Sequence, residues 1–330
     1  YSMVKHAVRE YAQIGVTTAQ SGGTTPVMAR GLNLMSKLGI VPQRLELFAF
    51  DSEFGDTLTN GEFDPADYNS ERTRLAAVKL VADGSIQGYT GYLSHPYHVP
   101  YHGDADYRGY PAMPREALFK RVEEQHRAGY QLAIHGNGDE SIEDIIDSIE
   151  AAQQAHPVED PRMILIHSQM ARKDHNARMK PLGITPSFLS AHTYYWGDRH
   201  RDIFMGPERA AAMSPAKWAQ EYGLVFSSHL DTPVVPMEPL QAVWSQVHRI
   251  SSGGDVIGED QRIDVMSALR AVNIDAAWQI FQEDNRGSLE PGKLDDIIVL
   301  SGNPLDDPMA MRELKVERTL VGGATIYRRQ

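Results

Sequence analysis

The chain has 330 residues, of which 42% are hydrophobic and 23% are charged, a composition ordinary for a globular protein. Its formal net charge of −12 argues against nucleic acid and anionic membranes as partners, because both would repel an acidic surface. The absence of cysteine excludes disulfide bonds and thiolate metal ligands. A metal ion would therefore need histidine, carboxylate or modified lysine ligands.

Helical and strand-like segments alternate along most of the chain. Hydrophobic spacing predicts helices at residues 3–14, 25–38, 114–128, 139–155, 172–181, 207–221, 238–251 and 261–282. Short apolar runs predict strands that begin near Val16, Arg44, Ala76, Tyr130, Met163, Gly183 and Leu224, the first of them closed by a Gly22-Gly23 loop. This alternation is typical of parallel strands with right-handed crossovers.

The length of the alternating region favours a barrel over an open sheet. We predict an α/β fold, a (β/α)8 TIM-type barrel over residues 1–284, with its first strand expected before Tyr1. After Asp284 the sequence pattern changes. Short β-type runs occur at 296–300, 316–321 and 324–327, and Gly322-Gly323 is predicted to form a hairpin turn. Residues 285–330 are therefore expected to form the C-terminal part of a small β-sandwich domain.

Polar side chains end or interrupt several of the predicted strands. Lys79, His135, His167 and Asp231 each lie within or directly after an apolar run. In a parallel barrel the functional side chains sit at the carboxyl ends of the strands. Simpler explanations exist for each residue: a strand-end histidine is often a hydrogen-bonded core residue, Lys79 could reach solvent, and Asp231 before Thr-Pro could cap a turn. Because the four residues lie in separate βα units, their shared position at strand ends favours a metal site.

Several segments resemble the amidohydrolase superfamily, specifically its amidohydrolase-3 (YtcJ-like) branch. They read VKLVADGSIQGYTGYL, LAIHGNGDESIEDIID, ILIHSQMARKD, HLDTPVVPMEPLQAV and RGSLEPGKLDDIIVLSGNPL. The resemblance implies that Lys79 is a carboxylated lysine bridging two metal ions. It also implies that His135 and His167 are metal ligands, and that Asp231 contacts the metal-activated water and shuttles its proton.

The implied activity is hydrolysis of a C–N bond of the amide, N-acyl or N-formyl type by a metal-dependent hydrolase. Zinc, as one or two ions, suits imidazole, carboxylate and carbamate ligands, and it brings the pKa of a bound water toward 7. Asp231 would accept that proton and deliver it to the leaving amine. The alternative is a catalytically silent or regulatory binding protein on the same scaffold.

Two departures from the family pattern bear on this reading. The chain has no His-x-His pair, which family members carry on strand one. We expect that pair, and an N-terminal β segment, upstream of Tyr1. Without it the chain is expected to hold at most one metal ion, on the Lys79 carbamate, His135 and His167. The second departure is Ser-His-Leu-Asp where the family usually has Gly-Ser-Asp, so His229 is either a residue supporting the site or a packing residue.

The substrate is expected to contact the segment 190–200. This segment follows the strand that begins near Gly183, which is the seventh strand when the expected first strand is counted. His192, Trp196 and Asp198 combine aromatic and polar groups as ligand pockets do, although a self-packed loop is an open alternative. Ser85 and His229 are further candidates, and residues 92–110 are interpreted as a flexible lid. The expected partner is a small-molecule substrate, with a homo-oligomer possible. No transmembrane helix is expected, and the compartment, cytoplasmic or periplasmic, stays open.

Overall fold

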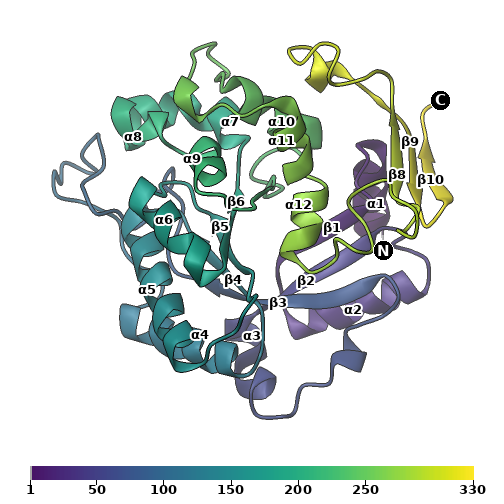
Figure 1. The fold of residues 1–330 in the computed structure, drawn as a ribbon, viewed down its shortest axis with the longest axis horizontal. Helices are drawn as coiled ribbons and strands as arrows, with labels where there is room; N and C mark the ends of the chain where they lie inside the picture. The colour runs from purple at the N-terminus through teal and green to yellow at the C-terminus, as the bar shows by residue number, and fades with distance from the viewer. Residues whose placement is uncertain (1) are drawn as a thin grey trace. The chain divides into compact units, whose positions relative to one another are not determined.

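The computed structural model describes residues 2–330, which divide into two compact units (Figure 1). The first unit comprises the described residues up to Lys79 together with Ile280–Gln330, and the second is Leu80–Gln279. The expected domain boundary at residue 284 does not coincide with the bounds of these two units, and it stays a prediction. No helix within residues 2–330 has the length and apolar character needed to cross a membrane.

The first unit begins with alternating helices and parallel strands. Its elements are α1 (Ser2–Gln13), β1 (Thr18–Thr24), α2 (Pro26–Lys37), β2 (Arg44–Phe50), α3 (Asp51–Phe54), η1 (Gly55–Leu58), η2 (Pro65–Asp67) and β3 (Thr73–Val81). Strand β2 pairs in parallel with β1 on one side and β3 on the other. Its residues are buried almost throughout, as in a parallel strand covered on both faces.

The predicted Gly22-Gly23 loop is wrong, because both glycines lie inside β1. The ring of Phe50 explains why glycine is needed there. A Cβ atom added to Gly23 would lie 2.1 Å from that ring. Gly23 therefore allows close packing within the strand, and the glycine pair does not end it.

A three-stranded antiparallel sheet completes the first unit. It consists of β8 (Ile297–Leu300), β9 (Val316–Val321) and β10 (Ala324–Arg328), with η5 (Met311–Glu313) before β9. The predicted Gly322-Gly323 hairpin between β9 and β10 is confirmed, and both glycines have positive φ. The Thr319 hydroxyl donates a 2.7 Å hydrogen bond to the Ala12 carbonyl, which ties β9 to the end of α1.

The second unit continues the parallel sheet. Its strands are β4 (Leu132–Gly136), β5 (Met163–His167), β6 (Ile184–Phe188) and β7 (Ser227–Ser228). Three long helices accompany them: α4 (Arg115–Arg127), α5 (Asp139–Ala155) and α6 (Lys173–Leu182). Figure 1 shows these helices together on one side of β4 and β5. The apolar face of α5, with Ile142, Ile145 and Ile149, is fully buried.

The seven parallel strands follow one another in chain order, from β1 to β7, in one sheet. The predicted strand–helix alternation is therefore confirmed. The closed eight-stranded barrel is not confirmed, because among residues 2–330 the sheet has seven strands with β1 and β7 at its two ends. The fold is mixed α/β, with a parallel seven-stranded sheet and a separate antiparallel sheet.

The later helices differ from the prediction in detail. The segment after β6, expected as a loop, forms α7 (His192–Arg199) followed by the π-helix η3 (His200–Phe204). The expected helix 207–221 is two helices, α8 (Pro207–Ala211) and α9 (Ala216–Glu221), interrupted where Ser214 has a φ of 47°. The remaining elements are α10 (Pro239–His248), η4 (Glu259–Gln261), α11 (Val265–Ala271) and α12 (Ile274–Gln279).

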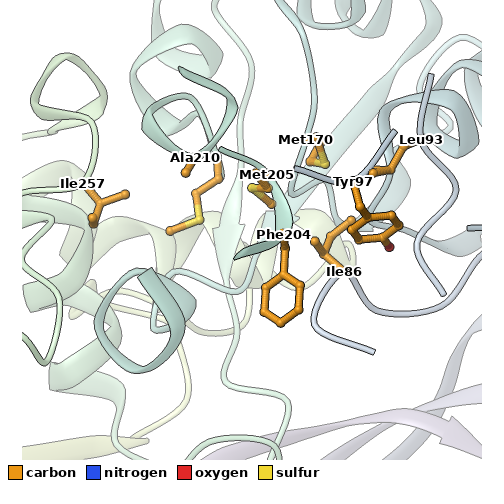
Figure 2. Packing of buried hydrophobic residues seen from close by; sticks show 9 residues of the cluster. Ile86, Leu93, Tyr97, Met170, Phe204, Met205, Ala210 and Ile257 are labelled. Carbon is orange, nitrogen blue, oxygen red and sulfur yellow. The ribbon is translucent and has the colours of Figure 1, made fainter. Parts of the chain in front are cut away.

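A hydrophobic cluster anchors the long segment between β3 and α4 (Figure 2). Ile86, Leu93 and Tyr97 from this segment are almost fully buried against Met170 and Phe204. The Tyr97 hydroxyl donates to the Gly91 carbonyl at 3.0 Å. The base of the predicted lid is thus packed into the second unit, while its tip, residues 98–100 and 102–106, is exposed. Its role as a lid stays a prediction.

Candidate metal centre

Two histidines meet at the carboxyl ends of neighbouring strands. His135 lies near the end of β4 and His167 ends β5, and the register places Gly136 opposite His167. Their rings are 4.4 Å apart between centroids and nearly perpendicular, at 76°. Parallel pairing brings strand ends to one edge of the sheet, which is why residues 32 positions apart in sequence become neighbours. These two rings are therefore neighbours, and the predicted convergence of all four residues on one cavity stays a prediction.

Asp83, just after β3, holds the His135 side of this pair. The Asp83 carboxylate is completely buried and accepts hydrogen bonds from four groups. Its Oδ1 lies 3.2 Å from His135 Nδ1 and accepts from the backbone N–H of Asn137 at 3.0 Å. Its Oδ2 accepts from the backbone N–H groups of Tyr92 and Gly138, at 3.0 and 2.8 Å. One carboxylate therefore fixes two loops and one imidazole.

Asn137 contacts the other nitrogen of the same imidazole. Its Nδ2 donates to the Gly84 carbonyl at 2.9 Å and lies 3.3 Å from His135 Nε2. The His135 side chain remains 17% exposed, so the ring is partly accessible to solvent. A position with such access suits a residue that binds a ligand.

His229, which directly follows β7, contacts His167 at the end of β5. His229 Nε2 lies 3.2 Å from His167 Nδ1, and the ring centroids are 4.9 Å apart. His229 Nδ1 lies 2.9 Å from the Ser187 hydroxyl, which accepts a hydrogen bond from Ser227. His229 thus lies beside His167, and its role at the site stays a prediction.

The backbone at the end of β5 is in an unusual conformation. His167 and Ser168 have φ values of 70° and 48°, in the left-handed region that non-glycine residues rarely adopt. Such a conformation costs on the order of 1–3 kcal/mol per residue and clusters at active sites and ligand clamps. The strain is a local reason to associate this strand end with function.

The other two predicted ligands are Asp231 and Lys79. Asp231 is exposed, in a turn with a φ of 55° in which its carbonyl accepts from the Val234 N–H. Lys79 is buried in β3, opposite Phe50, and belongs to the first unit. Their roles as metal ligands stay predictions.

His192 and Trp196 are one helical turn apart on α7 and carry buried ring nitrogens. No hydrogen-bond partner for His192 Nδ1 or Nε2, or for Trp196 Nε1, lies among residues 2–330. Burial lowers the pKa of His192 to about 3, so this imidazole is neutral near pH 7. His200 lies 5.6 Å from His192 between ring centroids, and burial holds the pKa of His200 well below its ordinary value. His192 and His200 are therefore neighbouring buried imidazoles whose burial disfavours the charged form.

Asp198 and Ser85 have local structural partners. Asp198 accepts from the Ser251 hydroxyl at 2.7 Å and from the Gly253 N–H at 3.1 Å. The Ser85 hydroxyl accepts from the Gly88 N–H at 3.1 Å. Both therefore stabilise turns, and their predicted substrate contacts stay untested.

A second group of possible metal ligands lies on the helices. Glu143, Asp174 and His175 have ligand atoms within 4.8 Å of one another. Arg172 pairs with both Glu143 and Asp174, at 2.7 and 2.9 Å, and Arg178 also pairs with Glu143. Because these guanidinium groups already neutralise the carboxylates, we interpret the group as an ion-pair network between α5 and α6.

A cavity of about 210 Å³ lies in the first unit, at the opposite ends of its strands. Arg44 and Thr73, the first residues of β2 and β3, line it together with Glu46, Arg74 and Arg286. Arg74 and Arg286 each pair with Glu46 at 2.9 Å, although burial still raises the pKa of this carboxyl. Since catalytic groups of parallel sheets sit at the carboxyl ends, we do not place the site here.

The residues that the sequence reasoning missed are those that support the histidines. The sequence pattern does not predict the contact of Asp83 with His135, and it singles out neither Asn137 nor Ser187. The rule that selected His135 and His167 also applies to Asp83, which directly follows β3. That signal could have identified it. The contact with Ser187 depends on the register of β6 against β7, which the sequence does not show.

The model of the amidohydrolase family matches residues 1–327 of this chain. The chain therefore belongs to the amidohydrolase family. It is 28% identical over 262 residues to YtcJ of Bacillus subtilis, a protein named as an amidohydrolase, covering 77% of this chain and 47% of YtcJ. It is 30% identical over 260 residues to the protein LONG AFTER FAR-RED 3 of Arabidopsis thaliana, covering 78% of this chain and 44% of that protein.

A third relative has a more specific name. The chain is 28% identical over 204 residues to an N-substituted formamide deformylase of Arthrobacter pascens, covering 62% of this chain and 38% of that enzyme. It thus spans about half the length, or less, of these curated relatives.

Solved structures share the fold. A metal-dependent hydrolase from Pyrococcus horikoshii superimposes with a TM-score of 0.73 at 24% identity, over 87% of this chain and 56% of that chain. The ochratoxinase of A. niger gives a TM-score of 0.63 at 16% identity, over 99% of this chain and 75% of that chain. At these identities the likeness supports the fold, and the site must be argued from its own residues.

Proposed function

We propose that the chain carries the site of a metal-dependent hydrolase that cleaves a C–N bond of the amide, N-acyl or N-formyl type. The observation that carries this proposal is the His135–His167 pair at adjacent strand ends, with rings 4.4 Å apart. Its donor set fits a divalent ion such as zinc, because neutral imidazole is a preferred ligand and Asp83 supports His135 in the way carboxylates support metal-binding histidines. Lys79, as a carbamate, would complete the ligand set.

A divalent metal held there would polarise the scissile carbonyl and activate water at neutral pH. Asp231 is proposed to contact the metal and to carry the proton from the attacking water to the leaving amine. Its carboxylate is exposed in a turn, where it can exchange protons with solvent. The name of the Arthrobacter relative, a deformylase of N-substituted formamides, supports a small N-acyl or N-formyl substrate.

On the substrate side, we propose that His192 and Trp196 bind an uncharged, hydrogen-bonding part of the substrate. Their ring nitrogens are buried without partners among residues 2–330, and such groups cost free energy unless a ligand or water satisfies them. Because His192 is neutral near pH 7, a charged substrate group would gain no ion pair from it.

The test compares hydrolysis of N-formyl and N-acyl amines by the wild type and by the variants His135→Asn and His167→Asn, with and without zinc. His6→Asn is the control, because His6 is exposed on α1. We expect zinc-dependent hydrolysis that falls by roughly 1000-fold in both site variants and is unchanged in the control. Zinc binding without hydrolysis of any amide would favour the alternative of a silent binding protein. Equal rates in all four proteins would refute the site.

A further inference from the structure

The cavity at the amino ends of β2 and β3 carries an excess of positive charge. Its volume is about 210 Å³, and its charged lining residues are Arg44, Arg72, Arg74, Arg286, Glu46 and Glu71. The excess remains when Asp296 is counted, whose carboxylate pairs with Arg44 at 2.6 Å. Because the whole chain has a formal net charge of −12, this is a local concentration of cations in an acidic protein.

One buried carboxylate is shared between two of the guanidinium groups. Glu46 Oε2 accepts from Arg74 Nε at 2.9 Å, and Glu46 Oε1 pairs with Arg286 Nη2 at 2.9 Å. Burial lowers the pKa of Arg286, Glu46 opposes this shift, and the positive charges of Arg44 and Arg74 add to it. These guanidinium groups therefore repel one another, and an anion beside them would stabilise their charged forms.

Arg72 is the lining arginine that the carboxylates leave unpaired. Its Nη1 donates to the Pro42 carbonyl at 3.2 Å, and its side chain is half-buried. No carboxylate forms an ion pair with Arg72 within residues 2–330. Since a guanidinium group has five N–H donors, Arg72 keeps donors for a ligand.

Three polar atoms on lining residues are buried without a hydrogen-bond partner in the described part of the chain: Thr73 Oγ1, Ser70 Oγ and Arg286 Nε. Thr73 is only 1% exposed. Such groups cost free energy unless a ligand or a water molecule completes their hydrogen bonds. Each of the three can donate a hydrogen bond, so together they favour a ligand that is rich in acceptors.

We propose that this cavity binds a small oxyanion, a carboxylate or phosphate group, at the amino ends of β2 and β3. Guanidinium groups form paired hydrogen bonds with the oxygens of both groups. The cavity is smaller than the roughly 300–1,000 Å³ of sites for drug-sized ligands, so it suits a compact ligand. The inference goes beyond the proposed hydrolase function.

The oxyanion site is separate from the proposed metal ligand on the same strand. Thr73 is the first residue of β3, and Lys79 lies six positions later. At the usual rise of a strand this is roughly 20 Å, which a compact anion does not span. Binding at the cavity should therefore need no metal ion.

The test measures the binding of inorganic phosphate and of succinate to the metal-free chain by isothermal titration calorimetry at constant ionic strength. We expect one anion per chain, and the tighter of the two probes identifies the class of ligand, phosphate or carboxylate. Chloride at the same ionic strength should not compete, because it lacks the paired oxygens that a guanidinium group recognises. No binding of either probe at millimolar concentrations would overturn the proposal.

Two variants connect the binding to the cavity. Arg72→Gln should weaken it by about 10–100-fold, because charge-assisted hydrogen bonds are lost. Thr73→Val keeps the shape of the side chain and should weaken it by about 2–10-fold through loss of the hydroxyl. Arg30→Gln is the matched control, because Arg30 lies on α2 with its side chain 57% exposed, and it should bind like the wild type.

Circular dichroism checks the fold of each variant, and Thr73→Val decides if Arg72→Gln misfolds. Wild-type affinity in both cavity variants, or an equal loss in Arg30→Gln, would contradict the assignment. His135→Asn should keep the wild-type affinity for the anion. Loss of anion binding in His135→Asn would place the anion at the proposed metal centre and would also overturn the proposal.

Discussion

His192 shows how burial alone sets the charge state of a residue. Its folded-state pKa of about 3 lies below the ordinary value, because burial disfavours the imidazolium. Between roughly pH 6.5 and pH 3 the unfolded chain binds a proton at this position that the folded chain does not. Stability is therefore unaffected above this window and is lost as pH falls through it.

We predict that His192→Leu makes the protein less acid-sensitive. Relative to pH 7, the wild type should lose about 2 kcal/mol more unfolding free energy at pH 5 than the variant, from the pKa difference at this one site. Urea denaturation at both pH values measures this difference. An equal loss in both proteins would show that His192 is protonated in the folded state.

His229 provides a second prediction at this scale. His229→Leu removes the 3.2 Å contact with His167 Nδ1, so His167 loses a group that fixes its orientation. We expect zinc affinity to fall by about 10–100-fold. His229→Gln, which can keep a polar atom near that position, should lose less. Equal affinity in His229→Leu and the wild type would leave His229 with only a packing role.

Single residues were predictable where one rule governs them. His135 and His167 could be placed because strand ends collect functional groups, and the structure brings them together. The Asp83–His135 bond and the left-handed backbone at His167 could not be predicted, since both depend on how neighbouring loops are held. The proposed role of Asp231, which lies in an exposed turn, is supported by the family resemblance.

At the scale of elements, the predictions succeeded for long periodic segments and failed for short ones. β2 begins at the predicted Arg44, and α5 has both of its predicted bounds. α7 was missed because its eight residues are rich in aromatic residues and contain Gly197, which weakens the helical pattern. The predicted strand from Leu224 is reduced to Ser227–Ser228 in β7, although His229 N–H still donates to the Phe188 carbonyl.

The segment between β3 and α4 allows a test of element anchoring. Leu93 is fully buried in the cluster that fixes this segment, whereas Val99 at its tip is 42% exposed. We predict that Leu93→Ala lowers the unfolding free energy by about 2–5 kcal/mol, because it leaves a cavity. Val99→Ala, the matched control, should change it by less than about 0.5 kcal/mol. Comparable urea midpoints for the two variants would show that the segment is not anchored here.

At the scale of the whole molecule, the order of the seven strands was predictable, and the closure of a barrel was not. Strand order follows from right-handed βαβ crossovers, which act locally along the chain. Closure requires the first and last strands to pair, and no sequence period reports that contact. The small antiparallel sheet was predictable from its glycine hairpin, whereas its grouping with α1 depends on long-range contacts such as that of Thr319 with Ala12.

The central claim is that His135 and His167 hold a divalent metal. Equilibrium dialysis against zinc, with metal content measured per chain, tests it most directly in the wild type, in His135→Asn, in His167→Asn and in the control His6→Asn. We predict that the wild type and the control retain zinc, and that both site variants lose it or bind it at least about 10-fold more weakly. Zinc retained equally by all four proteins would contradict the assignment.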